Sequence, residues 1–364
     1  LRPVQMISST HDGARPRVAL CPHISLAHYR GGEKWVAELA NRLVADDVDV
    51  TVRALPYLPR GERRVAVRDV LDERVPYHEA WRHDLSAFDT AYVFYMPLSH
   101  LLFTGAPRTV AGVHSWVYVT DRLYESHYGA VPTAVKVLYR AVGRRDLARF
   151  DAVHAVTPAY ESPHPVTHYI PNFVDTERFH PGRAPLDDEF TVLVTAAHIP
   201  EKGWDLARRV AGALPADVRV VTTGTSDDPN VRGLGFLDED GLARAYARSH
   251  VVLHPARVDT DSMVINEACA SGTPVVTTPL STHVGDGEAV LRRGSVRGMV
   301  DAIGTLRREW ERDDGYARRC RIARMTGEAH DVDVVYPRLK RLLLPTEEVP
   351  RARVTHRRLR RPVG

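Results

Sequence analysis

The chain has 364 residues, a length that suits two domains of about 150 to 200 residues better than a single core. Its 49 basic and 46 acidic side chains nearly cancel, so the formal charge of +3 points to no class of partner. Three cysteines exclude a disulfide framework and have no metal-ligand spacing, and no apolar run reaches the roughly 18 residues of a membrane-spanning helix.

Strand-like and helix-like segments alternate along the first half of the chain, a pattern typical of parallel α/β architecture. Apolar residues recur with a helical period over 33–47 and predict the first helix there. A second, basic amphipathic helix is predicted over 132–150. The expected strands are 17–22, 48–55, 90–96, 109–114 and 150–157.

The alternation breaks at 171–190, which is rich in Pro, Asp and Arg, and a second α/β series follows. Its expected strands are 190–197, 218–224, 251–255 and 274–279, and its expected helices begin at Gly203 and cover 239–249 and 262–270. The last 20 residues hold six arginines and no core pattern, which favours a disordered tail. We therefore expect an N-terminal domain over 1–182, a C-terminal domain over 183–344 whose last helix packs back on the first domain, and a tail over 345–364.

The stretch VVLHPARVDTDSMVINEACASGTPVVTTP, residues 251–279, holds the most informative side chains. It predicts a strand, a loop, and a helix that is capped by Asp261 or Ser262 and ends at Ser271-Gly272. Ligands of open α/β sheets bind beyond the carboxyl ends of the strands, where helix N-termini offer free N–H groups, so 259–264 predicts an anion site. Glu267 lies one turn into this apolar helix. Its carboxylate would accept hydrogen bonds from ribose hydroxyls, or else pair with an arginine or a backbone amide in a structural role.

This stretch resembles the motif of retaining glycosyltransferases of family 4, in which seven residues separate an acidic residue from Glu-Ala and a Gly-x-Pro-Val-Val end. Asp259 and Glu267 hold the two acidic positions here. Four other segments resemble the family in the same order along the chain. They are GGEKWVAELANRL (31–43), IPNFVDTERFHP (170–181), AAHIPEKGWDLA (196–207) and VRGLGFLDEDGLARAYARSHVVLHPA (231–256). The resemblance implies an α/β GT-B architecture, with two Rossmann-like α/β/α domains facing a cleft.

The resemblance also implies roles at the entrance of two helices. Gly31 and Gly32 would let backbone amides approach the donor diphosphate, because neither has a Cβ. Lys202, one of only four lysines in the chain, would contact the diphosphate, with His198 beside it. The alternatives are a simple helix-entry turn for the two glycines and a solvated surface position for the lysine.

Further roles follow from the same resemblance at the acidic motif and at one strand end. Backbone amides of Ser262, Met263 and Val264 would bind phosphate oxygens, and Glu267 would hold the ribose. Asp259 would face hydroxyls of the transferred sugar, and His114 would lie near that sugar and the acceptor. A histidine at a strand end is otherwise usually structural. Neither a metal nor another cofactor is implied, since a nucleotide-diphosphate sugar is the co-substrate.

Three departures from the family pattern leave the donor sugar open. Asp259 is one methylene shorter than the usual glutamate, and Ala197 stands where an arginine is expected. The loop PLSTHVGDGEAV, residues 279–290, replaces the usual Gly-Gly-x-x-Glu. The triplet Asp-Thr-Asp at 259–261 is also compatible with the metal-chelating motif of GT-A transferases, although a single GT-A domain does not fit two α/β halves.

The resemblance implies transfer of a sugar with retention of configuration, with the departing diphosphate helping to deprotonate the acceptor and with domain closure about 180–189. The partners would be the nucleotide-sugar donor and a glycan, lipid-linked or small-molecule acceptor. Basic residues at 59–74, at 132–150 and in the tail would either contact anionic lipid or remain solvated. Aromatic residues do not alternate with these basic residues, so this pattern does not indicate binding to nucleic acid.

Two other classes of function stay open. One is a GT-B phosphorylase or epimerase, and the other is a non-catalytic binding protein that has kept the fold. The N-terminus has no charged, apolar and small-residue targeting pattern, so we expect a cytoplasmic protein that can touch the inner membrane face peripherally.

Overall fold

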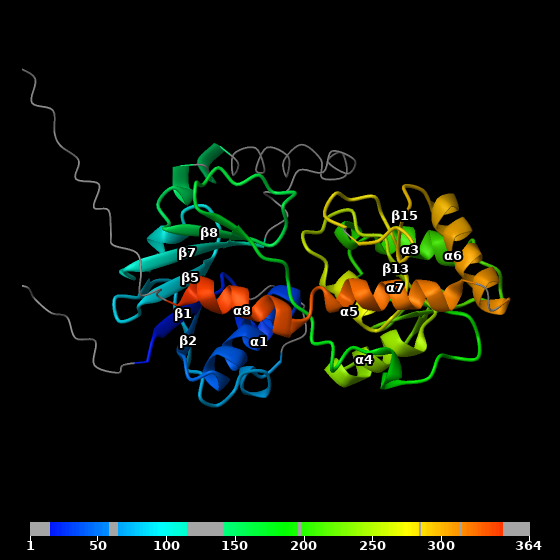
Figure 1. Ribbon diagram of the computed structural model, residues 1–364, viewed down its shortest axis with the longest axis horizontal. Helices are drawn as coiled ribbons and strands as arrows, with labels where there is room; N and C mark the ends of the chain where they lie inside the picture. The colour runs from blue at the N-terminus through cyan, green and yellow to red at the C-terminus, as the bar shows by residue number, and fades with distance from the viewer. Residues whose placement is uncertain are drawn as a thin grey trace, which may run out of the picture.

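The computed structural model describes residues 15–57, 65–114, 141–143, 145–195, 198–283, 285–312 and 315–344. These residues build two parallel sheets that lie side by side, each with helices on its faces (Figure 1). The chain completes the first sheet, crosses to the second, and returns to the first in its last described helix. None of the helices in these ranges is both long and apolar enough to cross a membrane.

The first sheet has seven parallel strands in the order β3-β2-β1-β5-β7-β8-β9. Its strands are β1 Arg17–Cys21, β2 Asp49–Ala54, β3 Tyr77–Glu79, β5 Thr90–Phe94, β7 Arg108–Val113, β8 Ala152–Ala155 and β9 Thr167–Tyr169. A separate pair consists of β4 His83–Asp84 and β6 Phe103–Thr104. Short 3-10 helices cover Leu26–His28, Val67–Asp69, Ser99–Leu101, Pro181–Arg183 and Pro200–Lys202.

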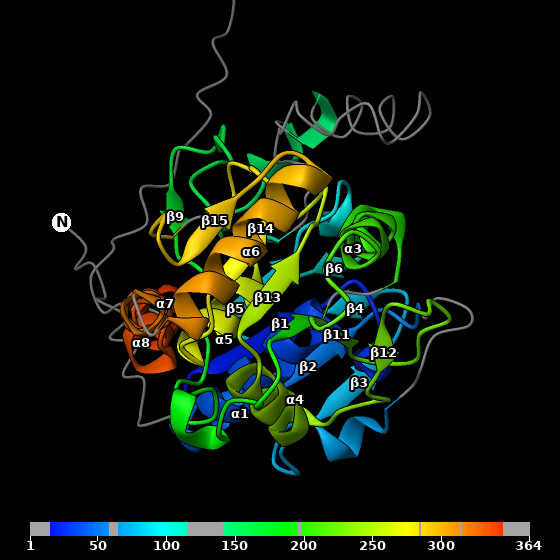
Figure 2. The same ribbon diagram turned by 90° about the vertical axis from the view of Figure 1, so that its right-hand side faces the viewer.

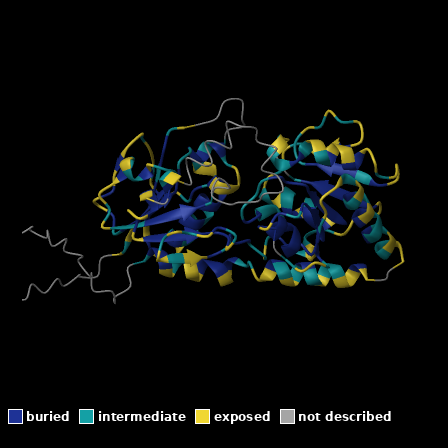
Figure 3. Ribbon diagram, turned by 90° about the horizontal axis from the view of Figure 1, so that it is seen from above, coloured by how far each residue is buried: buried dark blue, intermediate teal, exposed yellow. Residues whose placement is uncertain are grey.

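Successive side chains of a strand point to opposite faces of the sheet, and in the central strands both sets are buried. Val18 and Leu20 of β1 pack toward helix α1 (Gly31–Ala45), whereas Ala19 and Cys21 pack on the other face. Figure 3 shows buried strands (dark blue) inside and exposed positions (yellow) on the outer surfaces of the helices.

Helix α8 (Val332–Leu343) joins the core of the first sheet although it follows the second sheet in sequence (Figure 1). Val335, Leu339 and Leu343 are fully buried in that core. At its surface, the Tyr336 hydroxyl donates a 2.8 Å hydrogen bond to Oδ2 of Asp46, just beyond α1. The last described helix therefore ties the end of the chain to the first half.

The second sheet has six parallel strands in the order β12-β11-β10-β13-β14-β15. They are β10 Thr191–Val194, β11 Arg219–Thr222, β12 Arg232–Gly233, β13 Val251–His254, β14 Val275–Thr277 and β15 Val290–Arg292. The helices are α3 Trp204–Ala211, α4 Glu239–Arg248, α5 Met263–Ala270, α6 Val296–Glu311 and α7 Tyr316–Glu328. Helices α3 and α6 pack on one face, and α4, α5 and α7 on the other (Figure 2).

The structure confirms the predicted central strands, the helices α1, α4 and α5 and the start of α3 to within about two residues, except that β10 ends at Val194, three residues before the predicted end at 197. The edge strands β3, β9, β12 and β15 were not predicted, because each has only two or three residues. Residues 132–140 and 144 of the predicted basic helix lie outside the described residues, as do Ala197, 58–64 of the basic stretch and the tail over 345–364.

Candidate functional site

Two helix N-termini meet where the two halves of the molecule touch. A Cβ placed on Gly31, the first residue of α1, would lie 3.4 Å from Sδ of Met263, the first residue of α5. Each N-terminus has unpaired backbone N–H groups and the positive end of a helix dipole. Two such ends side by side form an anion-binding region made from both halves of the chain.

The N-cap of α5 is Ser262, whose Oγ accepts from the Ile265 N–H, so one of the two predicted caps is confirmed. Asp261 does not cap the helix and instead binds Asn172. Its carboxylate accepts a hydrogen bond from the backbone N–H of Asn172, and its carbonyl oxygen accepts a 2.8 Å bond from Asn172 Nδ2. These two bonds fix the loop before α5 to the connection that follows the first sheet.

His114, at the end of β7, lies against the same loop. Its carbonyl oxygen accepts a 3.2 Å hydrogen bond from Thr260 Oγ1, and its ring stacks on Phe94 with a centroid separation of 4.4 Å. The first sheet therefore places the predicted sugar-facing histidine next to the second domain's acidic motif.

The protonation of the His114 ring follows from a chain of buried hydrogen bonds. Nε2 of His154 lies 2.8 Å from the carbonyl oxygen of Ile170 and must donate to it. Nδ1 of His154 must then accept from the Tyr92 hydroxyl, 2.5 Å away, and the Tyr92 oxygen must accept from Nε2 of His114, 2.7 Å away. His114 is thus left with a bare Nδ1, which accepts hydrogen bonds.

Burial keeps the three hydrogen-bonded side chains of Tyr92, His114 and His154 uncharged. It lowers the pKa of His114 well below the usual histidine value, lowers that of His154 to about 4, and raises the pKa of Tyr92 well above its usual value. Gly112 on β7 makes room for the hydroxyl, since a Cβ there would lie only 2.2 Å from Tyr92 Oη.

Lys202 and Asp259 are in contact, with Nζ 3.2 Å from Oδ1. The approach depends on Gly203, which has φ +73° and whose Cβ, if present, would lie 1.9 Å from the carbonyl oxygen of Pro255. Burial raises the pKa of the Asp259 carboxyl, but Lys202 and the neighbouring imidazoles outweigh burial and hold that pKa well below its usual range. Asp259 is therefore an anion in the resting structure.

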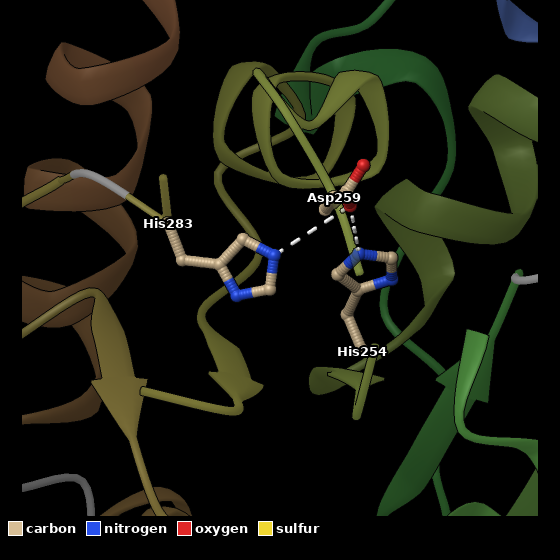
Figure 4. Close-up of side chains that lie close together, drawn as sticks. All are labelled: His254, Asp259 and His283. Atoms are coloured by element: carbon tan, nitrogen blue, oxygen red, sulfur yellow. Dashed lines mark hydrogen bonds and ion pairs between the residues drawn. The ribbon is translucent and has the colours of Figure 1, made fainter. Parts of the chain in front are cut away.

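The second oxygen of Asp259 is enclosed by two histidines (Figure 4). Oδ2 lies 2.7 Å from Nε2 of His254, at the end of β13, and 3.5 Å from Nε2 of His283, in the loop after β14. Neither histidine was predicted as a site residue, although His254 ends a predicted strand and His283 lies in the loop that departs from the family pattern.

Glu267 is 6% exposed and has a partner on each oxygen. Lys34 of α1 places Nζ 2.9 Å from Oε1, and the Tyr246 hydroxyl donates a 3.0 Å bond to Oε2. Lys34 also lies 2.8 Å from Oε2 of Glu239. Burial lowers the pKa of Lys34, but Glu267, Glu38 and Glu239 raise it by more, so the lysine is charged.

His198 contacts Trp204 and Thr222 and none of the site residues described above. Its ring stacks on Trp204 at 3.7 Å with an interplanar angle of 9°, and its Nε2 lies 3.0 Å from Thr222 Oγ1. Burial lowers its pKa, so its ring is a neutral hydrogen-bonding group. Of the predicted site residues, Gly31, His114, Lys202, Asp259, Ser262 and Met263 are connected through direct contacts and one shared loop.

Comparison with known proteins agrees with this arrangement. Residues 182–309 match the family model described as glycosyl transferases group 1. No curated protein matches the sequence at a significant level.

Similar solved structures include sucrose-phosphate synthase from Thermosynechococcus elongatus, with a TM-score of 0.69 and 16% identity over 90% of this chain and 98% of that one. The Anabaena protein HepE in complex with UDP-glucose has a TM-score of 0.67 and 15% identity, over 90% of this chain and 99% of HepE. WaaG, a glycosyltransferase involved in lipopolysaccharide biosynthesis, has a TM-score of 0.62 and 14% identity, over 90% and 99%. The predicted GT-B fold is thus confirmed: the segment 182–309 matches the glycosyl transferases group 1, and over 90% of its length the chain has the two-domain GT-B fold of these structures.

Proposed function

We propose that this protein is a retaining glycosyltransferase, which moves a sugar from a nucleotide-diphosphate sugar to an acceptor hydroxyl. The observation that carries the proposal is the meeting of the α1 and α5 N-termini at Gly31 and Met263, with Lys202 held close by through Asp259 and His254. A diphosphate is the part of a sugar donor that needs such a concentration of positive charge.

In the proposed complex the backbone amides at Ser262, Met263 and Val264 bind phosphate oxygens. Gly31 and Gly32 approach them from the first domain, where a side chain would narrow the gap to Met263. Lys202 turns from Asp259 toward the diphosphate; with 34% of its side chain exposed, it has room to do so. The proposed reaction needs no metal on the diphosphate, because these groups supply the charge.

Glu267 is proposed to accept hydrogen bonds from the ribose. Nucleotide binding must then loosen Lys34 from Oε1, and Glu239 remains as the partner that keeps the ammonium group paired. Because HepE was solved with UDP-glucose, UDP-sugars are the first donors to test. In this proposal α5 would contact both the phosphates and the ribose, and Lys34 of α1 would compete with the ribose for Glu267.

The proposed transfer breaks the bond between the anomeric carbon and the diphosphate oxygen and forms a bond to the acceptor oxygen on the same face. The acceptor proton passes to the departing diphosphate, so the protein acts mainly by positioning and charge stabilisation. The bare Nδ1 of His114 accepts from a hydroxyl of the sugar or of the acceptor. The acceptor is proposed to be a glycan, a lipid-linked sugar or a small molecule at the cytoplasmic side.

Turnover tests this proposal. The full chain is incubated with UDP-, GDP- and ADP-sugars and a panel of simple glycoside acceptors, and released nucleoside diphosphate is measured. Acceptor-dependent release and an NMR spectrum with an unchanged anomeric configuration are expected. An inverted product would contradict retention. Cleavage of a glycoside by phosphate without nucleotide would identify a phosphorylase instead.

A further inference from the structure

His254, Asp259 and His283 bring three metal-ligand atoms within 4.8 Å of one another (Figure 4). Both histidines are 1% exposed, and the Asp259 side chain is 10% exposed. The three residues come from the end of β13, from the loop before α5 and from the loop after β14, all at the carboxyl edge of the second sheet. We propose that they bind one divalent transition-metal ion of the Zn²⁺ class.

Hydrogen bonding leaves Nε2 of the His283 ring to face Asp259. The Thr277 hydroxyl donates to the carbonyl oxygen of His254 at 2.7 Å, so it must accept from Nδ1 of His283, 2.8 Å away. Nδ1 is therefore the donor of this side of the ring, which leaves Nε2 to face Asp259. Among the described residues Nε2 has no hydrogen-bond partner, yet it lies 3.5 Å from a carboxylate oxygen. A buried ring nitrogen without a hydrogen-bond partner that faces a carboxylate oxygen is a suitable place for a cation.

The distances suit a metal with small adjustments. A tetrahedral ion with bonds of about 2.0–2.1 Å has ligand atoms roughly 3.3 Å apart. The separations of 2.7 Å and 3.5 Å from Asp259 Oδ2 to the two imidazole nitrogens lie on either side of that value. The metal would take the place of the hydrogen between His254 and Asp259, and that hydrogen would move to Nδ1 of His254, which has no hydrogen-bond partner among the described residues. Lys202 would keep the other carboxylate oxygen.

The donor set selects the class of metal. Two imidazoles and one carboxylate suit Zn²⁺ and its neighbours, whereas Mg²⁺ and Ca²⁺ prefer oxygen ligands. The Thr277 hydroxyl orients His283 through the nitrogen that would not bind the metal, as second partners of metal-bound histidines commonly do. Asp259 and His254 also hold Lys202 near the proposed diphosphate site, but this inference does not depend on the proposed function, because metal binding by these residues is measured without nucleotide.

Metal binding by the full chain is the test. Chelator-treated protein is titrated with Co²⁺, whose visible absorption reports its coordination, and with Zn²⁺ by calorimetry. One equivalent with tetrahedral-type absorption is expected. His283→Gln should abolish that absorption, and Thr277→Val, which keeps all three ligands, should weaken binding 10- to 100-fold. The exposed His78 of β3 provides the matched control, because His78→Gln leaves the cluster intact.

The proposal is wrong if wild type takes up no ion at micromolar concentration, or if His283→Gln binds as wild type and His78→Gln do. If His283→Gln fails to fold, Thr277→Val provides the test. Metal affinity of Thr277→Val equal to that of wild type would also refute the assignment. Nucleotide binding is measured separately in chelator, so loss of one property is distinguishable from loss of the other.

Discussion

Lys34 Nζ lies 2.9 Å from Glu267 Oε1, and this buried ion pair joins the first helix of one domain to the α5 helix of the other. The carboxylate proposed to hold the ribose is thus also one of the groups that connect the two domains in the resting structure. Because Lys34 and the Tyr246 hydroxyl each occupy one oxygen of Glu267, ribose hydroxyls would compete with Lys34 for Oε1.

Replacing Lys34 with Met should therefore destabilise the protein and increase its response to nucleotide. Removing one partner of a buried ion pair costs about 3–5 kcal/mol, because the other charge is left buried and unpaired. Ribose hydroxyls would then supply the missing donors, so the thermal shift caused by nucleotide should exceed that of wild type. Differential scanning fluorimetry with and without UDP measures both effects.

Lys340→Met is the control for that variant. Lys340 pairs with Asp46 at 2.7 Å, but its side chain is 32% exposed, and such pairs contribute at most about 1 kcal/mol. Equal nucleotide responses of Lys34→Met and Lys340→Met would show that Lys34 does not compete with the ribose.

Tyr92→Phe should change the protonation pattern of His114. In wild type the Tyr92 oxygen accepts from Nε2, so His114 carries its hydrogen there. Without the hydroxyl, buried nitrogens of His114 and His154 lose a partner, at a cost of about 1–3 kcal/mol, and His114 should populate both tautomers. Nitrogen-15 NMR, assigned with a His114→Gln spectrum, reads the tautomer directly. A wild-type His114 that carries its hydrogen on Nδ1 would contradict this chain of hydrogen bonds.

Gly203→Ala should disrupt the position of Lys202. The added Cβ would lie 1.9 Å from the Pro255 carbonyl oxygen, and φ of +73° is unfavourable for alanine. Gly224 makes a matched comparison, since it has φ +84° but nothing within 4 Å of an added Cβ. Gly224→Ala should cost about 1 kcal/mol, and Gly203→Ala at least about 2 kcal/mol, as measured by urea unfolding. Equal losses would mean that the contact with Pro255 is unimportant.

Buried histidines should make stability fall in mild acid. Burial lowers the pKa of His250 to about 4, against an ordinary value of 6.5, so between these pH values only the unfolded chain binds the proton. The free energy of unfolding therefore decreases as pH falls through this window, by up to about 1.4 kcal/mol per unit for this group. His250→Asn keeps the acceptor for the Thr191 N–H, now 3.1 Å from Nδ1, and should reduce the slope. If the free energy of unfolding changed equally with pH from 7 to 5 in wild type and in His250→Asn, the role of His250 would be contradicted.

The sequence predicted the central strands well because each is a short apolar run that both faces of a sheet bury, as in β1 and β13. It also predicted helix α5 of the candidate site, since the helix that begins at Met263 has clear start and stop residues. Edge strands such as β12, with two residues, have too little pattern to detect.

The partners of the predicted residues could not be read from the sequence. Lys34 and Glu267 are separated by 233 positions, and only the packing of α1 against the second domain brings them together. The same applies to Tyr92 of β5, His114 directly after β7 and His154 of β8, which belong to three neighbouring strands of the first sheet. His283 gave no signal, because the spacing of one histidine from His254 and Asp259 matches no linear metal motif.

The most direct test of the donor site is the thermal stability of wild type and Glu267→Gln with UDP, GDP, ADP and their sugar conjugates, each with and without chelator. The exposed Glu161 supplies the control variant Glu161→Gln. A nucleotide at one hundred times its dissociation constant should stabilise wild type and the control by about 2.7 kcal/mol, with little effect of chelator. We predict a shift with one nucleotide that Glu267→Gln loses. No shift with any nucleotide, or an equal shift in Glu267→Gln, would contradict the assignment of this site to a nucleotide-sugar donor.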